Sequence, residues 1–318
     1  MASYLSEISP EYFSLSAHVG ANTVEPNFTD IQFMKNAGVS VIDRALNYGD
    51  GCFTTMYCEH GKVFILDEHI QRLKFDTQKL DIPFCTATMK HCLSEVSRVV
   101  QLNERSAAAI KILVSRGVGG RGYEPPESPV TQIVISVYST HKLDVSVQQC
   151  KSYKHTVRIA NMQLSSQVLL GGIKHLNRLE QVFAKQELRA RGCDDLLLCN
   201  QSGNVIEGSA SNVFLLKQGV WLSPEISDCG VNGLMRKSIL AFMNVHKIPC
   251  AVRKISVNDI IGAESVFLCN SLKFVVPVSN FHDREQDVTF NIMPSHVMLR
   301  NIYQWLSGDK LLTLELTA

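Results

Sequence analysis

The sequence is poor in the features that mark membrane, nucleic-acid-binding and zinc proteins. No apolar run approaches the roughly 20 residues that a membrane-spanning helix needs. The charges nearly cancel, with 31 Lys and Arg against 30 Asp and Glu, and no basic run offers a footprint for nucleic acid. The ten cysteines are scattered without a C-x-x-C pair, which predicts reduced thiols in a cytoplasmic protein rather than a zinc site. We therefore predict no membrane, nucleic-acid or metal partner.

The N-terminus also lacks a secretion signal, because residues 1–29 contain no basic start followed by an apolar run. A chain of 318 residues is long enough for about two domains. The polar stretch 139–144 has no periodicity, and we place the domain boundary there. We predict an N-terminal extension of unknown role over residues 1–30, a smaller domain over 31–140 and a larger domain over 145–318.

Lys174 follows two glycines and an isoleucine and precedes an amphipathic pattern. The apolar residues of this pattern recur at helical spacing before a glycine that favours a helix end: Leu176, Leu179, Phe183, Leu188 and Gly192. The pattern predicts that Lys174 stands at the start of a helix, where backbone N–H groups disfavour a second positive charge. An amine in such a place is suited to forming a Schiff base. The alternative interpretation is a surface lysine beside a helix.

Two further motifs of the smaller domain contain charged residues. Residues 43–53 read D-R-A-L-N-Y-G-D-G-C-F, and their glycines and aspartates favour a turn after a short strand over 39–43. A helix is predicted to begin with Asp67 as its N-cap, and it carries the pair His69 and Arg72. A guanidinium binds phosphate through two parallel hydrogen bonds, although an arginine on a helix is more often a solvated side chain.

The loop over residues 115–123 is rich in glycine and arginine and reads S-R-G-V-G-G-R-G-Y. Its glycines satisfy the G-x-G-x-x-G spacing of dinucleotide-binding proteins. That interpretation needs a helix directly after the glycines, and the prolines at positions 125, 126 and 129 argue against one. Arg116 and Arg121 are instead candidates for binding the carboxylates of an anionic substrate.

The larger domain holds three more candidate groups. The stretch V-I-E-G-S-A-S-N-V-F contains Glu207 where a strand passes into a loop. The stretch G-V-N-G precedes a predicted helix, so the backbone amides of Val231 and Asn232 are candidates for an anion site. Ser271 follows a predicted strand and offers a hydroxyl group.

The stretch G-I-K-H-L-N-R-L-E-Q around Lys174 resembles the lysine segment of the aminodeoxychorismate lyases, a family of fold-type IV pyridoxal 5′-phosphate (PLP) enzymes. The other motifs resemble the signatures of that family in the same order, over roughly residues 39–280. The resemblance implies a mixed α+β or α/β fold, with a smaller N-terminal α/β domain and a larger C-terminal domain that contains a barrel-like sheet. It also implies PLP in the cleft between the domains, and a homodimer.

The resemblance assigns roles to the candidate residues. Lys174 would form the Schiff base with PLP and act as general acid and base. Glu207 would pair with the pyridine nitrogen and keep the ring able to accept electrons. The residues that the resemblance gives to the cofactor phosphate are Arg72, Val231, Asn232 and Ser271.

The implied reaction converts a small molecule, 4-amino-4-deoxychorismate, to 4-aminobenzoate and pyruvate. A D-amino-acid or branched-chain aminotransferase of the same fold is the main alternative, since it would share Arg72, Lys174 and Glu207. Such enzymes tend to read K-S-L-N or K-G-x-N-Y after the lysine, whereas this chain reads K-H-L-N-R-L-E-Q. A PLP-binding protein without catalysis, or a regulator, is the third possibility, and the three intact residues argue against it.

Overall fold

The structure, a computed structural model, describes residues 18–19, 39–90, 92–93, 107–146, 154–283, 286–309 and 311–313. Most of the predicted N-terminal extension lies outside these residues. The chain forms two compact units. The first unit contains residues 1–142, 174–177 and 310–318, and the second contains residues 143–173 and 178–309. The short segment with Lys174 therefore belongs to the first unit, although residues on both sides of it belong to the second.

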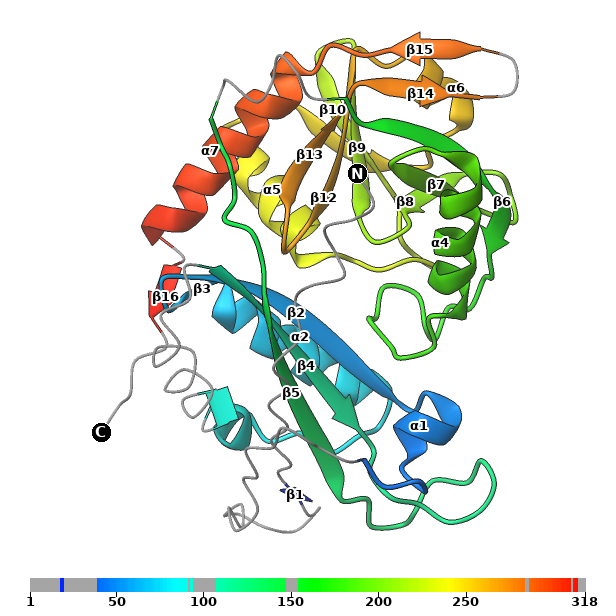
Figure 1. Ribbon diagram of the computed structural model, residues 1–318, viewed down its shortest axis with the longest axis vertical. Coiled ribbons are helices and arrows are strands. Elements are labelled where there is room, and N and C mark those ends of the chain that lie inside the picture. The colour runs from blue at the N-terminus through cyan, green and yellow to red at the C-terminus, as the bar shows by residue number, and fades with distance from the viewer. Residues whose placement is uncertain are drawn as a thin grey trace. The chain divides into compact units, whose positions relative to one another are not determined.

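The first unit is built on a six-stranded sheet in which every neighbouring pair of strands is antiparallel (Figure 1). In sheet order the strands are β1 (His18–Val19), β5 (Thr131–Ser139), β4 (Ala107–Ser115), β2 (Gly51–Glu59), β3 (Lys62–Phe64) and β16 (Leu311–Thr313). The sequence of β5, T-Q-I-V-I-S-V-Y-S, explains its place, because every second residue from Thr131 to Val137 is buried.

Helix α2 (Leu66–Lys79) packs on this sheet. Ile70 and Leu73 join Met56 and Ile110 of the strands in one apolar core, as helical spacing requires of a half-buried helix. The prediction that Asp67 is the N-cap of this helix is wrong. The N-cap residue is Ile65, with a φ of 51°, and its side chain makes no capping hydrogen bond. Asp67 lies in the first turn instead, where a carboxylate is favoured by the helix dipole.

The segment before β2 differs from the sequence prediction. Residues 39–43 do not form a strand, and Val41 has 79% of its surface exposed. Residues Arg44–Tyr48 form a short helix, α1, in place of the predicted turn. The Asp43 side chain caps it by accepting a hydrogen bond from the Ala45 amide at 2.7 Å. Gly49, with a φ of 64°, ends the helix in the left-handed conformation that glycine adopts readily.

The second unit contains two five-stranded sheets. In sheet order the first has β11 (Cys250–Arg253), β10 (Val220–Pro224), β9 (Asn212–Lys217), β12 (Ser265–Asn270) and β13 (Phe274–Val278). The second has β15 (Asp287–Thr289), β14 (Asn280–His282), β6 (Thr156–Leu164), β7 (Asp195–Asn200) and β8 (Val205–Gly208). One core joins the two sheets, with Val157 and Leu197 from one and Val213 and Val266 from the other.

The strands of the two sheets do not close into a barrel within the described part of the chain. An isolated bridge between Val205 and Ile255 links their edges, but β8 and β9 are not paired as a ladder. In place of the predicted barrel-like sheet, the described residues of this unit form two open sheets around a shared core. The mixed α/β character is as predicted.

Four helices accompany these sheets (Figure 1): α4 (Leu179–Arg191), α5 (Leu234–Val245), α6 (Val257–Ile261) and α7 (Met293–Asp309). Ala184 of α4 packs with Ala160 and Leu198 of β6 and β7. Gly192 ends α4 in the left-handed conformation, as predicted. None of the helices in the described ranges combines the length and apolar character needed to cross a membrane.

Most of the described cysteines lie in the hydrophobic cores. Six of those described are buried, and none of the described cysteines forms a disulfide. Burial raises the pKa of Cys199 to about 11 and that of Cys269 to about 12, so both thiols are protonated at neutral pH. Over the described residues, no group of three or more metal-binding side chains lies together.

Candidate active site

Lys174 lies in an extended segment, not at the start of a helix, because α4 begins only at Leu179. Its carbonyl accepts a hydrogen bond from the Phe53 amide at 2.9 Å, and the Leu176 amide donates to the Gly51 carbonyl at 3.0 Å. The segment therefore lies along the start of β2. A Cβ on Gly51 would come within 2.8 Å of Leu176 Cδ1, so the leucine that suggested a helical face packs on this strand instead.

The Lys174 side chain is half-buried, with Nζ at 4.6 Å from the centre of the Phe53 ring. Its backbone amide donates to Asp76 Oδ2 at 3.0 Å. Asp76 lies on the same face of α2 as His69 and Arg72, because spacings of three and four residues bring side chains to one side of a helix. All three of these α2 residues are buried. The H-x-x-R motif and the lysine segment thus meet within the first unit.

His69 is a neutral imidazole in this cluster. Burial, followed by the positive charges of Arg72 and Lys174, lowers its pKa well below the usual value. Its Nδ1 shares a hydrogen bond of 2.6 Å with Thr54 Oγ1. Its Nε2 is buried and has no hydrogen-bond partner among the described residues. A buried polar atom of this kind, beside a buried guanidinium and an amine, marks a place where an external polar group fits.

In the second unit, Glu207 lies near the end of β8 and is buried. Its Oε2 accepts a hydrogen bond from the Val231 amide at 2.8 Å, and its Oε1 accepts a longer one from Gln181 Nε2 at 3.4 Å. Gly230 has a φ of 74°, and a Cβ there would lie 2.6 Å from Ile206 Cγ2 and 3.2 Å from Glu207 Oε2. The structure therefore brings Glu207 and the predicted anion-binding turn together, with glycine required at their closest approach.

The backbone amides of Val231 and Asn232 in this turn already donate hydrogen bonds to other groups of the protein. The Val231 amide donates to Glu207, and the Asn232 amide donates to the Gly172 carbonyl at 3.0 Å. A cofactor phosphate would have to replace these bonds, so the phosphate role of the two amides stays a prediction. Ser271 is half-buried in the turn between β12 and β13, and its predicted role also remains untested.

Two residues without an assigned role in the sequence hold the turn in place. Asn212 donates from Nδ2 to the Val231 carbonyl at 2.8 Å and accepts from the Gly233 amide at 3.1 Å. Arg236 donates to Asn232 Oδ1 at 3.0 Å, and burial lowers its pKa. Asn212 belongs to the same stretch V-I-E-G-S-A-S-N-V-F as Glu207, which could have pointed to it, whereas nothing in the sequence distinguished Arg236 from a solvated arginine of α5.

The arginine-rich loop is organised by the carboxylate of Asp50, which Arg44 of α1 and Arg116 of the loop share. Asp50 Oδ2 accepts hydrogen bonds from Arg44 Nε at 2.7 Å and Arg116 Nε at 2.8 Å. Arg44 also donates to three successive loop carbonyls, those of Gly122, Tyr123 and Glu124. Arg44 thereby fixes the course of the loop, a role that the sequence did not reveal.

Arg116 is buried, and its other guanidinium nitrogens donate to the carbonyls of Leu80 and Asp81 at the end of α2, at 2.6 and 2.7 Å. These contacts give Arg116 a structural role, and its predicted binding of substrate stays a prediction. Arg121 is exposed in the loop, and its predicted role as a substrate ligand stays a prediction.

The chemistry of these residues fits PLP. In the first unit, Lys174 would supply the amine for the aldehyde carbon, and Arg72 would supply a guanidinium for the phosphate oxygens. The open Nε2 of His69 offers one further hydrogen bond there. In the second unit, the Glu207 carboxylate suits a protonated pyridine nitrogen.

Comparison with known proteins agrees with this reading. The model of the family described as amino-transferase class IV matches residues 51–281. An aminodeoxychorismate lyase of Vibrio harveyi is 32% identical over 252 residues, 79% of this chain and 90% of the relative. A putative branched-chain-amino-acid aminotransferase of Methanocaldococcus jannaschii is 30% identical over 79% of this chain and 85% of the relative.

A solved structure is similar as well. The crystal structure of 4-amino-4-deoxychorismate lyase from Pseudomonas aeruginosa has a TM-score of 0.72 and 31% identity, and covers 86% of this chain and 96% of that one. The chain therefore belongs to the class IV aminotransferase family, whose fold is that of the fold-type IV enzymes and whose cofactor is PLP.

Proposed function

We propose that this protein is a PLP-dependent lyase that converts 4-amino-4-deoxychorismate to 4-aminobenzoate and pyruvate. The observation that carries the proposal is the run K-H-L-N-R-L-E-Q, whose two ends contact candidate residues. Lys174 at one end is held by Asp76 beside Arg72, and Gln181 at the other end donates to Glu207. The similarity to two lyases supports the proposal, at 32% and 31% identity.

The residues divide the work of the reaction. When bound, PLP supplies an electron-accepting ring that stabilises negative charge on the amine-bearing carbon of the substrate. Lys174 takes the proton from that carbon. The C–O bond on the neighbouring carbon then breaks as a ring double bond forms, and Lys174 returns a proton to the enolpyruvate that departs and becomes pyruvate. Glu207 keeps a proton on the pyridine nitrogen. Because His69 stays neutral, it adds no third positive charge beside Arg72 and Lys174.

Product analysis with the purified holoenzyme tests this function. Incubation with 4-amino-4-deoxychorismate alone is expected to yield 4-aminobenzoate and pyruvate in equal amounts, without any 2-oxo acid as amino acceptor. Glu207→Gln should lower the rate strongly, because a neutral amide cannot hold the pyridine proton as a carboxylate does. A holoenzyme that leaves this substrate unchanged would refute the proposal.

The second candidate is a D-amino-acid or branched-chain aminotransferase. The 30% identity to the Methanocaldococcus jannaschii protein, which is described as such an aminotransferase, favours it. A transaminase transfers the amino group to its cofactor and then needs a 2-oxo acid to complete the cycle. Rapid conversion of D-alanine or L-leucine in single turnovers, with no 4-aminobenzoate formed, would replace the lyase with this alternative.

We also propose that the protein is a homodimer that uses the outer face of α4. Leu179, Val182 and Phe183 on this helix are exposed, with 70%, 48% and 56% of their surfaces accessible. The sequence pattern had placed Leu179 and Phe183 at helical spacing on one face, and an exposed apolar cluster of this kind marks an interface. Light scattering should give twice the 35.4 kDa of one chain, and Phe183→Glu should shift the mass towards the monomer. A monomeric wild-type protein would exclude the dimer.

A further inference from the structure

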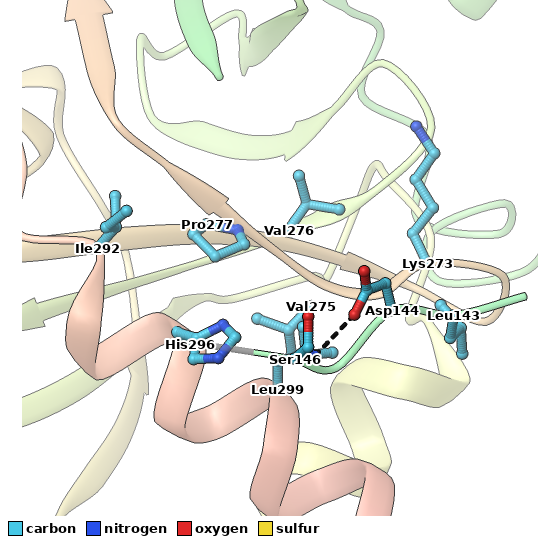
Figure 2. A pocket seen from close by; sticks show the side chains of 10 residues that line it. All are labelled: Leu143, Asp144, Ser146, Lys273, Val275, Val276, Pro277, Ile292, His296 and Leu299. Atoms are coloured by element: carbon cyan, nitrogen blue, oxygen red, sulfur yellow. Dashed lines mark hydrogen bonds between the residues drawn. The ribbon is translucent and has the colours of Figure 1, made fainter. Parts of the chain in front are cut away.

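A pocket in the second unit contains none of the residues assigned to the cofactor. It lies between the first turns of α7, strand β13 and the segment 143–146 (Figure 2), and its volume is about 220 Å³. A cavity of about 150 Å³ lined by aliphatic and aromatic side chains holds benzene. The pocket therefore has room for one six-membered ring with small substituents.

Most of the pocket lining is apolar. Its apolar residues are Leu143, Val275, Val276, Pro277, Ile292 and Leu299. Such walls favour a ligand whose bulk is a hydrocarbon ring, because its burial removes apolar surface from water. The same walls give a large or highly charged ligand little to bind.

One polar side chain is enclosed among these walls. His296 of α7 is 5% exposed, and its ring faces the interior of the residue cluster (Figure 2). Its Nε2 is buried and has no hydrogen-bond partner among the described residues. Burial, then the charge of Arg300, lowers the pKa of His296 despite the opposing effect of Asp144, so the imidazole is neutral at neutral pH. An enclosed neutral imidazole with an open nitrogen can make one hydrogen bond to a ligand.

A carboxylate stands at the exposed side of the pocket. Asp144 accepts a hydrogen bond from the Ser146 amide at 2.8 Å, drawn in Figure 2. Hydrogen bonds from the side chain and amide of Ser146 hold the pKa of Asp144 below its usual value, so the group is an anion. Lys273 also borders the pocket, and its ammonium group extends away from Asp144 and His296 in this view. The charge on the Asp144 side of the pocket is therefore negative.

We propose that this pocket binds a single-ring aromatic amine, with the ring between α7 and β13, the amino group donating to Asp144, and a second polar ring substituent hydrogen-bonded to His296 Nε2. This binding does not depend on the reaction proposed above. If that function also holds, its product 4-aminobenzoate has this chemistry, and the pocket is a second, non-catalytic site for the product.

Calorimetric titration of the holoenzyme with 4-aminobenzoate and with benzoate, which lacks the amino group, tests the proposal. We expect 4-aminobenzoate to bind more tightly than benzoate. His296→Phe keeps a ring but removes Nε2, and should weaken 4-aminobenzoate binding on the order of tenfold. Asp144→Asn should weaken 4-aminobenzoate severalfold and leave benzoate unchanged, since only the amine meets the carboxylate.

The controls are a histidine and an aspartate of the same unit that lie outside the pocket. His282→Phe and Asp287→Asn each remove a partly exposed hydrogen bond between β14 and β15 and should leave both affinities unchanged. A thermal melt will show whether His296→Phe folds. If it does not, Asp144→Asn alone tests the proposal, because Asp144 is exposed and its replacement leaves no buried gap.

Two outcomes would overturn the proposal. One is that neither probe binds, as expected if residues of this chain fill the pocket. The other is that 4-aminobenzoate binds wild type and both pocket variants with equal affinity but does not bind holoenzyme whose cofactor has been reduced onto the protein. That result would place 4-aminobenzoate at the catalytic site alone. A failure of the proposed function appears instead as missing product formation and leaves the binding measurements interpretable.

Discussion

Asp50→Asn should destabilise the first unit strongly, because it removes the one charge that two buried guanidiniums share. Arg44 and Arg116 have side chains that are 4% and 8% exposed, and that of Asp50 is 13% exposed. The amide of asparagine can still accept a hydrogen bond, but it cannot neutralise either arginine. Breaking a buried ion pair by removing one partner costs about 3–5 kcal/mol. We expect a loss in this range, which in hydrogen exchange is an acceleration of roughly 10²-fold to several thousandfold.

The assay must report on the first unit, and both tryptophans, Trp221 and Trp305, belong to the second. Hydrogen exchange by mass spectrometry provides the readout through the amides of β2 and β4. The control is Asp287→Asn, at a carboxylate that is 73% exposed, which should change the opening free energy by less than about 0.5 kcal/mol. Equal exchange in wild type and Asp50→Asn would show that solvent replaces the carboxylate and would refute the argument.

The stability that Asp50 contributes to the first unit should depend on pH, and the direction of this dependence follows from its pKa. Burial alone raises the pKa of Asp50, but the hydrogen bonds and charges of Arg116 and Arg44 outweigh it, and the pKa is lowered overall. A carboxylate with a depressed pKa in the folded state stabilises the protein above its unfolded value, about 3.9, and this contribution fades as the pH falls through the folded value. The difference between wild type and Asp50→Asn should therefore be full at pH 7 and shrink below about pH 4. A difference that is constant with pH would contradict the charge-based explanation.

Three further predictions concern the cofactor residues and the turn beside Glu207. Arg72→Ala should weaken PLP retention about tenfold to a hundredfold in equilibrium dialysis, because one charge-assisted hydrogen bond to phosphate contributes roughly 1.5–3 kcal/mol. Borohydride reduction of the holoenzyme should fix the cofactor on Lys174, as peptide mass spectrometry would show. Gly233→Ala should lower stability by about 1–3 kcal/mol in thermal melts, since its Cβ would lie 2.0 Å from Asn212 Oδ1 and break the bonds of that side chain.

Each of these predictions has a matched control. Arg189→Ala, at an exposed position of α4, should leave PLP retention unchanged, and an equal loss in both arginine variants would point to a general effect of charge. Recovery of the reduced cofactor on Lys154 or Lys185 would overturn the assignment of the lysine. Gly262→Ala introduces a Cβ that meets its nearest atom at 3.4 Å, an ordinary contact, and should be close to neutral.

Elements that rest on local pattern could be predicted from the sequence. The helix that carries His69 and Arg72 begins within two residues of where the pattern placed it. Its position follows from apolar residues at the helical period, which is a local property. The end of α4 at Gly192 was equally visible, because a glycine after the last turn takes up the left-handed conformation at little cost.

Features that depend on partners distant in the sequence could not be predicted. Leu176 fits a helical period, yet it packs on Gly51, more than a hundred positions earlier, and the helix starts after it. Leu179 and Phe183 are exposed. Their burial could not be predicted either, because apolar residues at helical spacing can face a core or another molecule. Within the stretch over 43–53, residues Arg44–Tyr48 form a helix where a turn was predicted, through the cap by Asp43, whose Oδ1 also accepts from Ser115 Oγ.

The arginines show most clearly why a motif does not assign a role. Arg44, Arg72, Arg116 and Arg236 are all buried, and a buried guanidinium must find acceptors for its five N–H groups. Arg44 and Arg116 find them in one carboxylate and several carbonyls, and Arg236 finds them in a hydroxyl, a carbonyl and Asn232. Arg72 differs in its surroundings, because it shares its face of α2 with a neutral histidine whose outer nitrogen has no partner among the described residues. That difference in local environment, rather than the residue type, makes Arg72 the arginine to test for phosphate binding.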